Sequence, residues 1–254
     1  MPVVPYFQPL IRVQTGSFEG LEALARYNRG GRVYAPAKFM NGMKGNPERE
    51  AAFDWLMLKR VVENCREWIA DGVSFESVGW NVGSGCLGSD SFVEKLSCCL
   101  TSIDMDPKAL AIEITEAALS GHSYEKKLSN IEAARAFGCK IALDDFGTGG
   151  SSLSILRDVP CTAIKIAGEF VDDVLVNWRV AAIVEGIVGV AHSLGVLVVA
   201  ECVESETQFE AISDLGCDLV QGHFFFEAVP GSRVPNLLDS LKRRNHLEGL
   251  NALP

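Results

Sequence analysis

The run VLVVAE, at residues 196–201, is the stretch of sequence that most constrains the fold. Five consecutive apolar residues with no polar residue between them predict a β-strand that is covered on both faces, as the strands of parallel sheets are. Apolar residues three and four positions apart, over 178–194 and 206–215, predict amphipathic helices before and after this strand. The run ends on a carboxylate, Glu201. The segment therefore predicts a parallel α/β unit with an acidic group at the carboxyl end of its strand.

The same alternation of strand and helix recurs along the chain. It predicts eight strands, at Phe7–Val13, Gly20–Tyr27, Ser74–Val82, Leu110–Thr115, Lys140–Asp144, Ala163–Ile166, Val196–Ala200 and Leu219–Phe225. Helical spacing predicts further helices at Ala51–Asp71, Asp90–Ile103 and Ser123–Phe137. The link between the first two strands, residues 14–19, is too short for a crossover helix, so these strands are expected to pair antiparallel. We predict an α/β fold, a TIM-like (β/α)8 barrel with an irregular, antiparallel strand near the N-terminus.

Length and sequence pattern favour one domain. The chain has 254 residues, and α/β barrels need about 250. No low-complexity linker divides it, so residues 1–254 are expected to form a single domain, with a core over about 6–230 and a C-terminal helix and tail over 231–254. The most apolar stretch, Ile183–Val203, is interrupted by charged residues and glycines, and no secretory signal precedes the first strand. We therefore expect no membrane association.

Charge and cysteine usage restrict the partners and the compartment. The 23 Lys and Arg residues stand against 33 Asp and Glu residues, a formal net charge of −10, which argues against binding of polymeric DNA or RNA. The eight cysteines are scattered and show no C-x-x-C spacing for zinc. We interpret them as reduced thiols of a cytoplasmic protein.

Polar residues end nearly every predicted strand. Because the carboxyl ends of barrel strands meet at one rim, where catalytic groups of such barrels lie, these side chains are expected to line a single cup. The residues are Glu22, Arg26, Asn81, Glu113, Asp144, Asp145, Lys165, Glu201 and Gln221.

Five of these residues are carboxylates, and close like charges cannot all stay ionised unaided. Carboxylate oxygens together with the amide oxygen of Asn81 are hard ligands, which suit Mg²⁺ or Mn²⁺ better than zinc. Two divalent ions together with Lys165 would balance the five negative charges. A two-metal centre of this kind activates water and stabilises both oxygens of an in-line phosphoryl displacement.

Six short motifs follow one another along the chain at or near the ends of the predicted strands. They are Glu22-Ala23-Leu24, Asn81-Val82, Glu113-x-Thr115-Glu116, Asp144-Asp145-Phe146-Gly147-Thr148-Gly149, Ala200-Glu201-x-Val203-Glu204 and Gln221-Gly222. Together they resemble the motifs of the EAL-domain cyclic di-GMP phosphodiesterases, and the resemblance runs from about Tyr6 to Pro230. It implies hydrolysis of cyclic di-GMP to linear pGpG by Mg²⁺ or Mn²⁺.

The resemblance also implies a role for each matching residue. One ion would be held by Glu22, Asn81, Glu113 and Asp144, and the other by Asp144, Asp145 and Glu201. Lys165 would orient the nucleophilic water or stabilise its charge, Glu201 would act as general base, and Gln221 would hydrogen-bond within the site. Gln8, Leu24 and Arg26 would contact the substrate. Glu116 would fix the loop after Asp145, and Glu204 would support the residues that hold the metal ions.

The chain departs from the family pattern in places. Ala167 follows Lys165-Ile166 where the family has an aspartate, which bears on turnover. Cys202 replaces a glycine beside Glu201, and Gly150 replaces a tyrosine in a loop that family members use in dimer contacts. Glu227-Ala228 stands where the family has Lys-Pro. A homodimer is therefore left open.

Other interpretations remain open from the sequence. Ala167 favours a receptor that binds cyclic di-GMP without cutting it. A degenerate protein-interaction module and a metal-dependent barrel acting on carboxylate substrates are two more alternatives. Each motif also has an ordinary explanation, such as a structural Lys165–Glu201 ion pair or a helix cap at Thr148 or Ser151. Of the histidines, which include His122, only His223 lies beside the predicted site.

Overall fold

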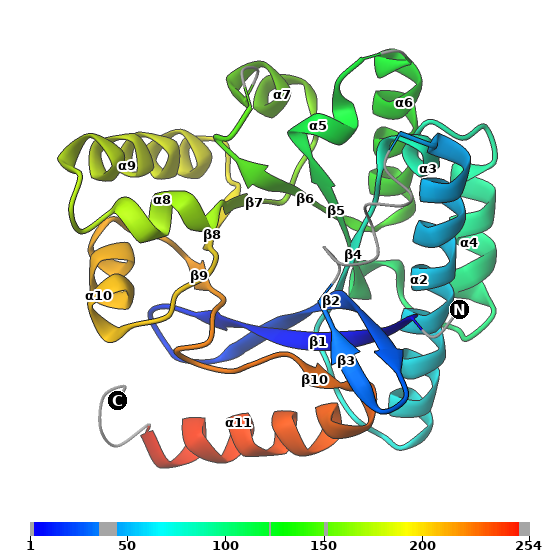
Figure 1. Ribbon diagram of the computed structural model, residues 1–254, viewed down its shortest axis with the longest axis horizontal. Coiled ribbons are helices and arrows are strands. Elements are labelled where there is room, and N and C mark those ends of the chain that lie inside the picture. The colour runs from blue at the N-terminus through cyan, green and yellow to red at the C-terminus, as the bar shows by residue number, and fades with distance from the viewer. Residues whose placement is uncertain (1–2, 36–44, 122, 150–151, 249–254) are drawn as a thin grey trace.

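Eight strands close into a barrel in the computed structural model, which describes residues 3–35, 45–121, 123–149 and 152–248 (Figure 1). Seven of them run parallel in the order β2-β4-β5-β6-β7-β8-β9, and β1 closes the barrel by pairing antiparallel with both β2 and β9. The predicted barrel with an antiparallel N-terminal strand is confirmed. The barrel strands are β1 (Val3–Arg12), β2 (Phe18–Arg29), β4 (Val78–Asn81), β5 (Leu110–Thr115), β6 (Lys140–Phe146), β7 (Ala163–Ile166), β8 (Leu197–Ala200) and β9 (Leu219–Val220).

Helices surround the barrel and cover the outward faces of its strands (Figure 1). Two short strands extend the sheet beyond the barrel, β3 (Arg32–Tyr34) beside β2 and β10 (Val229–Pro230) beside β1. The helices are α2 (Pro47–Ala70), α3 (Ser84–Leu87), α4 (Phe92–Thr101), α5 (Glu116–Leu119), α6 (Tyr124–Phe137), α7 (Ser152–Asp158), α8 (Gly168–Asp173), α9 (Trp178–Ser193), α10 (Glu206–Asp214) and α11 (Val234–Glu248), with 3₁₀ turns at Pro107–Ala109 and Gly231–Arg233.

Local sequence explains where several helices begin. The Asn46 side chain accepts a hydrogen bond from the Arg49 N–H and Pro47 follows it, a combination that favours the first turn of α2. Ser205 and Gln208 form a reciprocal capping box at the start of α10. These caps direct the chain from the rim of the barrel back along its outer surface.

Aromatic and aliphatic side chains fill the layer between the strands and the helices. Trp80 of β4 packs against Phe92 of α4, and its indole N–H donates to the Asp54 carbonyl of α2 at 3.0 Å. Trp68 of α2 packs edge-on to Phe7 of β1. The hydrophobic layer thus fixes α2 and α4 against the first half of the barrel.

The structure shortens two of the predicted strands. Only Val78–Asn81 of the segment 74–82 is a strand. The strand predicted at Leu219–Phe225 ends at Val220, because the N–H groups of Phe225 and Phe226 bond back to the Gly222 carbonyl in a turn. The short helices α3, α5, α7 and α8 are four to seven residues long, too short to give a periodic signal.

No helix in the described ranges combines the length and the apolar character that crossing a bilayer requires.

Candidate metal and active site

The rim at the carboxyl ends of the strands gathers the polar residues that the sequence singled out. Neighbouring strands set them side by side: Gln8 of β1 lies opposite Glu22 of β2, and Asn81 of β4 lies opposite Glu113 of β5. Lys165 lies on β7, and Glu201 follows β8 directly. Side chains that are far apart along the chain therefore share one cup.

Lys165 is the centre of this cup. It is 1% exposed, and its Nζ lies 3.0 Å from Glu22 Oε2, 2.8 Å from Glu113 Oε2, 3.3 Å from Asp144 Oδ1 and 2.6 Å from Glu201 Oε1. Burial alone would lower the pKa of this lysine, but the four carboxylates raise it well above its ordinary value. Lys165 therefore stays a cation and is suited to holding negative charge.

Glu22 and Glu113 both contact Lys165, yet their pKa values move in opposite directions. Burial raises the pKa of Glu22, but Lys165 and hydrogen bonds from Asn81 Nδ2 and Gln221 Nε2, each at 2.9 Å, more than offset it, so that the pKa is lowered. Burial and the negative charge of Glu22 raise the pKa of Glu113 well above its ordinary value, against the opposing effect of Lys165. The difference follows from the two amide hydrogen bonds to Glu22 and from the repulsion that Glu22 and Asp144 exert on Glu113.

Glycine at position 79 makes room for Glu113. A Cβ atom built on Gly79 would lie 1.8 Å from Glu113 Oε1, so no side chain fits between β2 and β5 at this point. The Glu113 carboxylate can reach Lys165 only because the intervening strand has no side chain there. This requirement cannot be recognised from the residues around position 79 alone.

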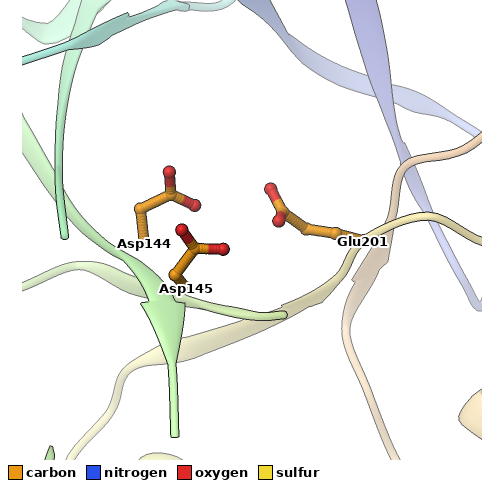
Figure 2. A group of neighbouring side chains, drawn as sticks. All are labelled: Asp144, Asp145 and Glu201. Carbon is orange, nitrogen blue, oxygen red and sulfur yellow. The ribbon is translucent and has the colours of Figure 1, made fainter. Parts of the chain in front are cut away.

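A β-bulge brings Asp144 and Asp145 to the same side of the rim. Successive strand residues normally point to opposite faces. Here the pairing of β6 with β7 shifts register between Leu143 and Phe146, and Asp145 takes φ 51°, the left-handed conformation that aspartate tolerates better than most residues. Figure 2 shows both aspartates facing Glu201, and one carboxylate oxygen of each of the three lies within 4.8 Å of the others.

The environment of this triad shifts two of its carboxyl groups towards the protonated form. Burial raises the pKa of Glu201 to about 7, against the opposing effect of Lys165. Burial and the neighbouring Asp144 raise the pKa of Asp145. Both carboxyl groups are therefore protonated more readily than an exposed carboxyl group, with burial as the largest cause.

The cup opens into a cavity of about 250 Å³. Gln8 donates from Nε2 to the Phe226 carbonyl at 3.0 Å and accepts from Gln221 Nε2 at 3.3 Å. Arg26 lies on the same face of β2 as Glu22 and Leu24, and burial lowers its pKa. The residues that line the cavity are Gln8, Glu22, Leu24, Asp144, Glu201, Cys202, Glu204, Gln221, Gly222 and His223.

The two predicted supporting glutamates occupy different environments. Glu116 begins α5, is buried, and accepts a hydrogen bond from the Gly147 N–H at 3.0 Å, in the loop after Asp145. Glu204 is largely exposed at the mouth of the cavity, with Oε1 3.8 Å from His223 Nδ1. Glu116 thus contacts the loop expected for it, whereas Glu204 contacts solvent and His223.

The residues that depart from the family pattern lie in different environments. Ala167 is buried at the start of α8 and caps it with no side-chain hydrogen bond. Cys202 has φ 56° and packs on Gly168, where an added Cβ would lie 2.8 Å from its sulfur. Gly150, Ser151 and His122 lie outside the described residues.

Sequence reasoning missed two residues near the site. Cys202 lines the cavity, and its signal was a cysteine at a family glycine position. Asp54 of α2 accepts from the Gly83 N–H at 2.9 Å, just beyond Asn81, and burial raises its pKa to about 7. A single aspartate within a helical pattern does not indicate from sequence that its side chain accepts a hydrogen bond beside the site.

The side chains that face the cup fit divalent cations. Among the described residues, Asp144 Oδ1 and Gln221 Oε1 are buried and accept no hydrogen bond, although Lys165 Nζ lies 3.3 Å from the Asp144 oxygen. A buried carboxylate oxygen that accepts no hydrogen bond and lies beside two more carboxylates is in the kind of environment that Mg²⁺ or Mn²⁺ occupies. The oxygen-only character of the triad agrees with these ions rather than zinc.

Comparisons with known proteins agree with this geometry. A family model described as EAL domain matches residues 2–228. Cyclic di-GMP phosphodiesterase RocR of Pseudomonas aeruginosa is 32% identical over 226 residues, which cover 89% of this chain and 57% of the relative. The chain spans 29 to 57% of the length of the first curated relatives that it matches.

Two solved structures also match. One, described as PaMucR phosphodiesterase in complex with c-di-GMP, has a TM-score of 0.83 and 27% identity, and the match covers 92% of this chain and 94% of that one. Klebsiella pneumoniae BlrP1, in a manganese and cy-diGMP complex, has a TM-score of 0.80 and 26% identity, covering 91% of this chain and 57% of that one.

Proposed function

The chain belongs to the EAL domain family, and from that premise we propose that it is a metal-dependent phosphodiesterase that hydrolyses cyclic di-GMP to linear pGpG. The observation that carries the proposal is Lys165, buried among four carboxylates from separate strand ends, with Asp145 turned onto the same rim. Such a cluster of buried ionisable groups beside a cavity is typical of a functional site. RocR and PaMucR, whose names state this activity or substrate, support the proposal.

The proposed cofactors are two Mg²⁺ or Mn²⁺ ions. Asp144, Asp145 and Glu201 would hold one, and Glu22, Asn81 and Glu113 would hold the other together with Asp144. When bound, such ions activate water and neutralise charge that develops on the phosphodiester. The manganese complex of BlrP1 supports this assignment.

Residues of the chain itself would stabilise charge, transfer a proton and contact the substrate. Lys165, held cationic by its neighbours, would stabilise negative charge on the attacking oxygen. Glu201, with a pKa of about 7, would accept a proton near neutral pH as general base. Gln221, Gln8 and Leu24 would contact the substrate from the walls of the cavity, and Arg26 would contact it from the same face of β2 as Leu24.

Incubation of the purified chain with cyclic di-GMP and Mn²⁺, with and without a chelator, tests the proposal. We expect linear pGpG in the presence of the metal and none with the chelator, as separated by chromatography. Cyclic di-GMP that stays intact with both Mn²⁺ and Mg²⁺ would contradict the proposed activity.

Ala167 supports a second candidate, a receptor that binds cyclic di-GMP without cutting it. The missing carboxylate removes an acidic neighbour from the rim close to Lys165. Calorimetry separates the two functions, because a receptor gives saturable binding with no pGpG in the recovered sample.

A further inference from the structure

Helix α2 contacts the chain on both sides of Asn81, the last residue of β4. Both contacts come from Asp54, which is 8% exposed. Its carbonyl accepts from the Trp80 indole N–H at 3.0 Å, and its carboxylate Oδ2 accepts from the Gly83 N–H at 2.9 Å. One residue of α2 therefore binds the residue before Asn81 and the second residue after it.

The Gly83 contact lies where the regular pairing of the sheet stops. β4 ends at Asn81, and the Val82 N–H makes a further bond to β5, to the Glu113 carbonyl at 2.9 Å. The next N–H, that of Gly83, is directed to the Asp54 carboxylate instead of to a strand. Asp54 thus continues, from outside the barrel, the hydrogen bonding that fixes the backbone beyond Asn81.

The fit between α2 and the segment that leads into α3 is tight (Figure 1). A Cβ atom added to Gly83 would lie 3.2 Å from Asp54 Oδ2, and one added to Gly85 would lie 2.4 Å from the Pro47 carbonyl oxygen. At position 85 the backbone therefore approaches the first turn of α2 more closely than a side chain would permit. Because so little space separates the two, a change at the Asp54 contact is expected to reach Asn81.

The position of Asn81 matters for the inner part of the cup. Its Nδ2 donates to Glu22 Oε1 at 2.9 Å, and it lies opposite Glu113 in the sheet. In the proposed function its amide oxygen is a ligand of the metal ion that these two glutamates also hold. Hydrogen bonds that orient a ligand from outside the metal site contribute strongly to metal affinity. The contribution of Asn81 therefore depends on how its backbone is held.

From these contacts we propose that Asp54 is a positioning residue, which holds the end of β4 so that the Asn81 side chain faces the inner metal ion. It acts through the Gly83 N–H, because its carboxylate belongs to α2, on the outside of the barrel. The inference rests on the proposed function, in which Asn81 is a metal ligand. It gives a helix of the outer layer a part in metal binding.

Removal of the acceptor tests the proposal. Asp54→Ala keeps the carbonyl that binds Trp80 and removes the carboxylate that binds Gly83. We expect Mn²⁺ affinity in titration calorimetry to fall about 10- to 100-fold. Asp54→Leu fills the space with no acceptor and should give the same loss, so that the result does not depend on a cavity left by alanine. Asp54→Asn offers an amide oxygen to the same N–H and should restore most of the affinity.

Asn130→Ala is the matched control for a general loss of stability. Asn130 is 6% exposed and donates to the Leu87 and Ser89 carbonyls at 2.7 and 2.9 Å, at the opposite end of α3 from Gly83. Its removal should lower the melting temperature, as Asp54→Ala does, and leave Mn²⁺ affinity unchanged. Circular dichroism confirms that each variant folds.

A double-mutant cycle with Asn81→Ala shows whether the effect passes through Asn81. Once Asn81 is alanine, Asp54→Ala should lower Mn²⁺ affinity little further, because the two changes affect one ligand. Unchanged affinity in Asp54→Ala and Asp54→Leu, an equal fall in Asn130→Ala, or full additivity in the cycle would each overturn the proposal.

Formation of pGpG is measured separately, so that the two proposals fail in different ways. If the unaltered chain forms pGpG while Asp54→Ala binds Mn²⁺ as tightly, the positioning role alone is overturned. If the affinities follow the expected pattern and no pGpG forms, the positioning role is supported and the proposed activity is contradicted.

Discussion

Two groups of carboxylates share the rim but are stabilised differently. The inner cluster, Glu22 and Glu113, is buried and contacts Lys165, and Glu22 has two further amide donors. The outer triad, Asp144, Asp145 and Glu201, contacts the same lysine through Asp144 and Glu201 and includes two carboxyl groups with raised pKa values. The two groups thus share one lysine and differ in the amide donors to Glu22 and in the additional aspartate, Asp145, of the outer triad. The difference teaches that one lysine must compensate both groups, and that an external cation would bind most favourably at the outer one.

Removing the shared cation should have the largest effect. Lys165→Met leaves four carboxylates around an apolar side chain, so we expect a loss of about 3–5 kcal/mol in unfolding free energy together with at least 10²-fold slower hydrolysis. Thermal unfolding and rate assays measure the two effects. If Lys165→Met kept the unfolding free energy of the unaltered chain in the absence of metal, the inner cluster would not depend on Lys165.

Glu201→Gln should separate chemistry from stability. We expect hydrolysis to slow about 10²- to 10⁴-fold, because the general base is lost. The melting temperature should stay equal or rise, since a carboxylate that burial disfavours has been removed. A rate close to that of the unaltered chain would reject the assigned role.

Asp145→Asn should weaken metal binding at the outer triad and leave the inner cluster unchanged. Asparagine tolerates the left-handed conformation at this position, so the fold should be unaffected. We expect Mn²⁺ affinity to fall roughly 10- to 100-fold, as measured by titration calorimetry. Partial recovery of activity at high Mn²⁺ would follow, and unaltered affinity would remove Asp145 from the ligand set.

Metal-free stability should depend on pH through Glu201. Its pKa rises from 4.5 to about 7 on folding, so the folded state binds more protons than the unfolded chain between these values. The contribution of Glu201 to stability is therefore fully present below about pH 4.5 and is lost as the pH rises through 7, by on the order of 1–3 kcal/mol. Denaturant unfolding in chelator measures the slope.

The control for this prediction is Glu201→Gln, which should reduce the slope and leave the part that Asp54, Asp145 and Glu113 contribute, since their pKa values are raised as well. Excess Mn²⁺ should flatten it as well, because the metal replaces the protons. A slope of the opposite sign in the unaltered chain would contradict the assignment of the raised pKa.

Ala167→Asp should give the smallest effect. The new carboxylate would cap α8, which has no side-chain cap at present, and stabilise the chain by about 0.5–1 kcal/mol. It would also stand near Lys165, as the family pattern has it, and we expect at most a tenfold rise in hydrolysis rate. An unchanged rate would mean that Ala167 does not limit hydrolysis.

Sequence patterns predicted much of this arrangement. Polar residues at strand ends, from Glu22 to Gln221, indicated a shared rim, because parallel strands end on one side. They did not indicate that Lys165 contacts four carboxylates, since contacts across a barrel depend on register and rotamers. The bulge that turns Asp145 and the space that Gly79 provides follow from neighbouring strands and leave no pattern in the local sequence.

The contact between Cys202 and Gly168 ties two loops of the rim together. Any side chain at position 168 would collide with the thiol, unless residue 202 becomes smaller. A larger residue at position 168 is therefore tolerated only together with a smaller residue at position 202. A library that randomises both should recover larger residues at 168 almost only in clones that carry glycine at 202.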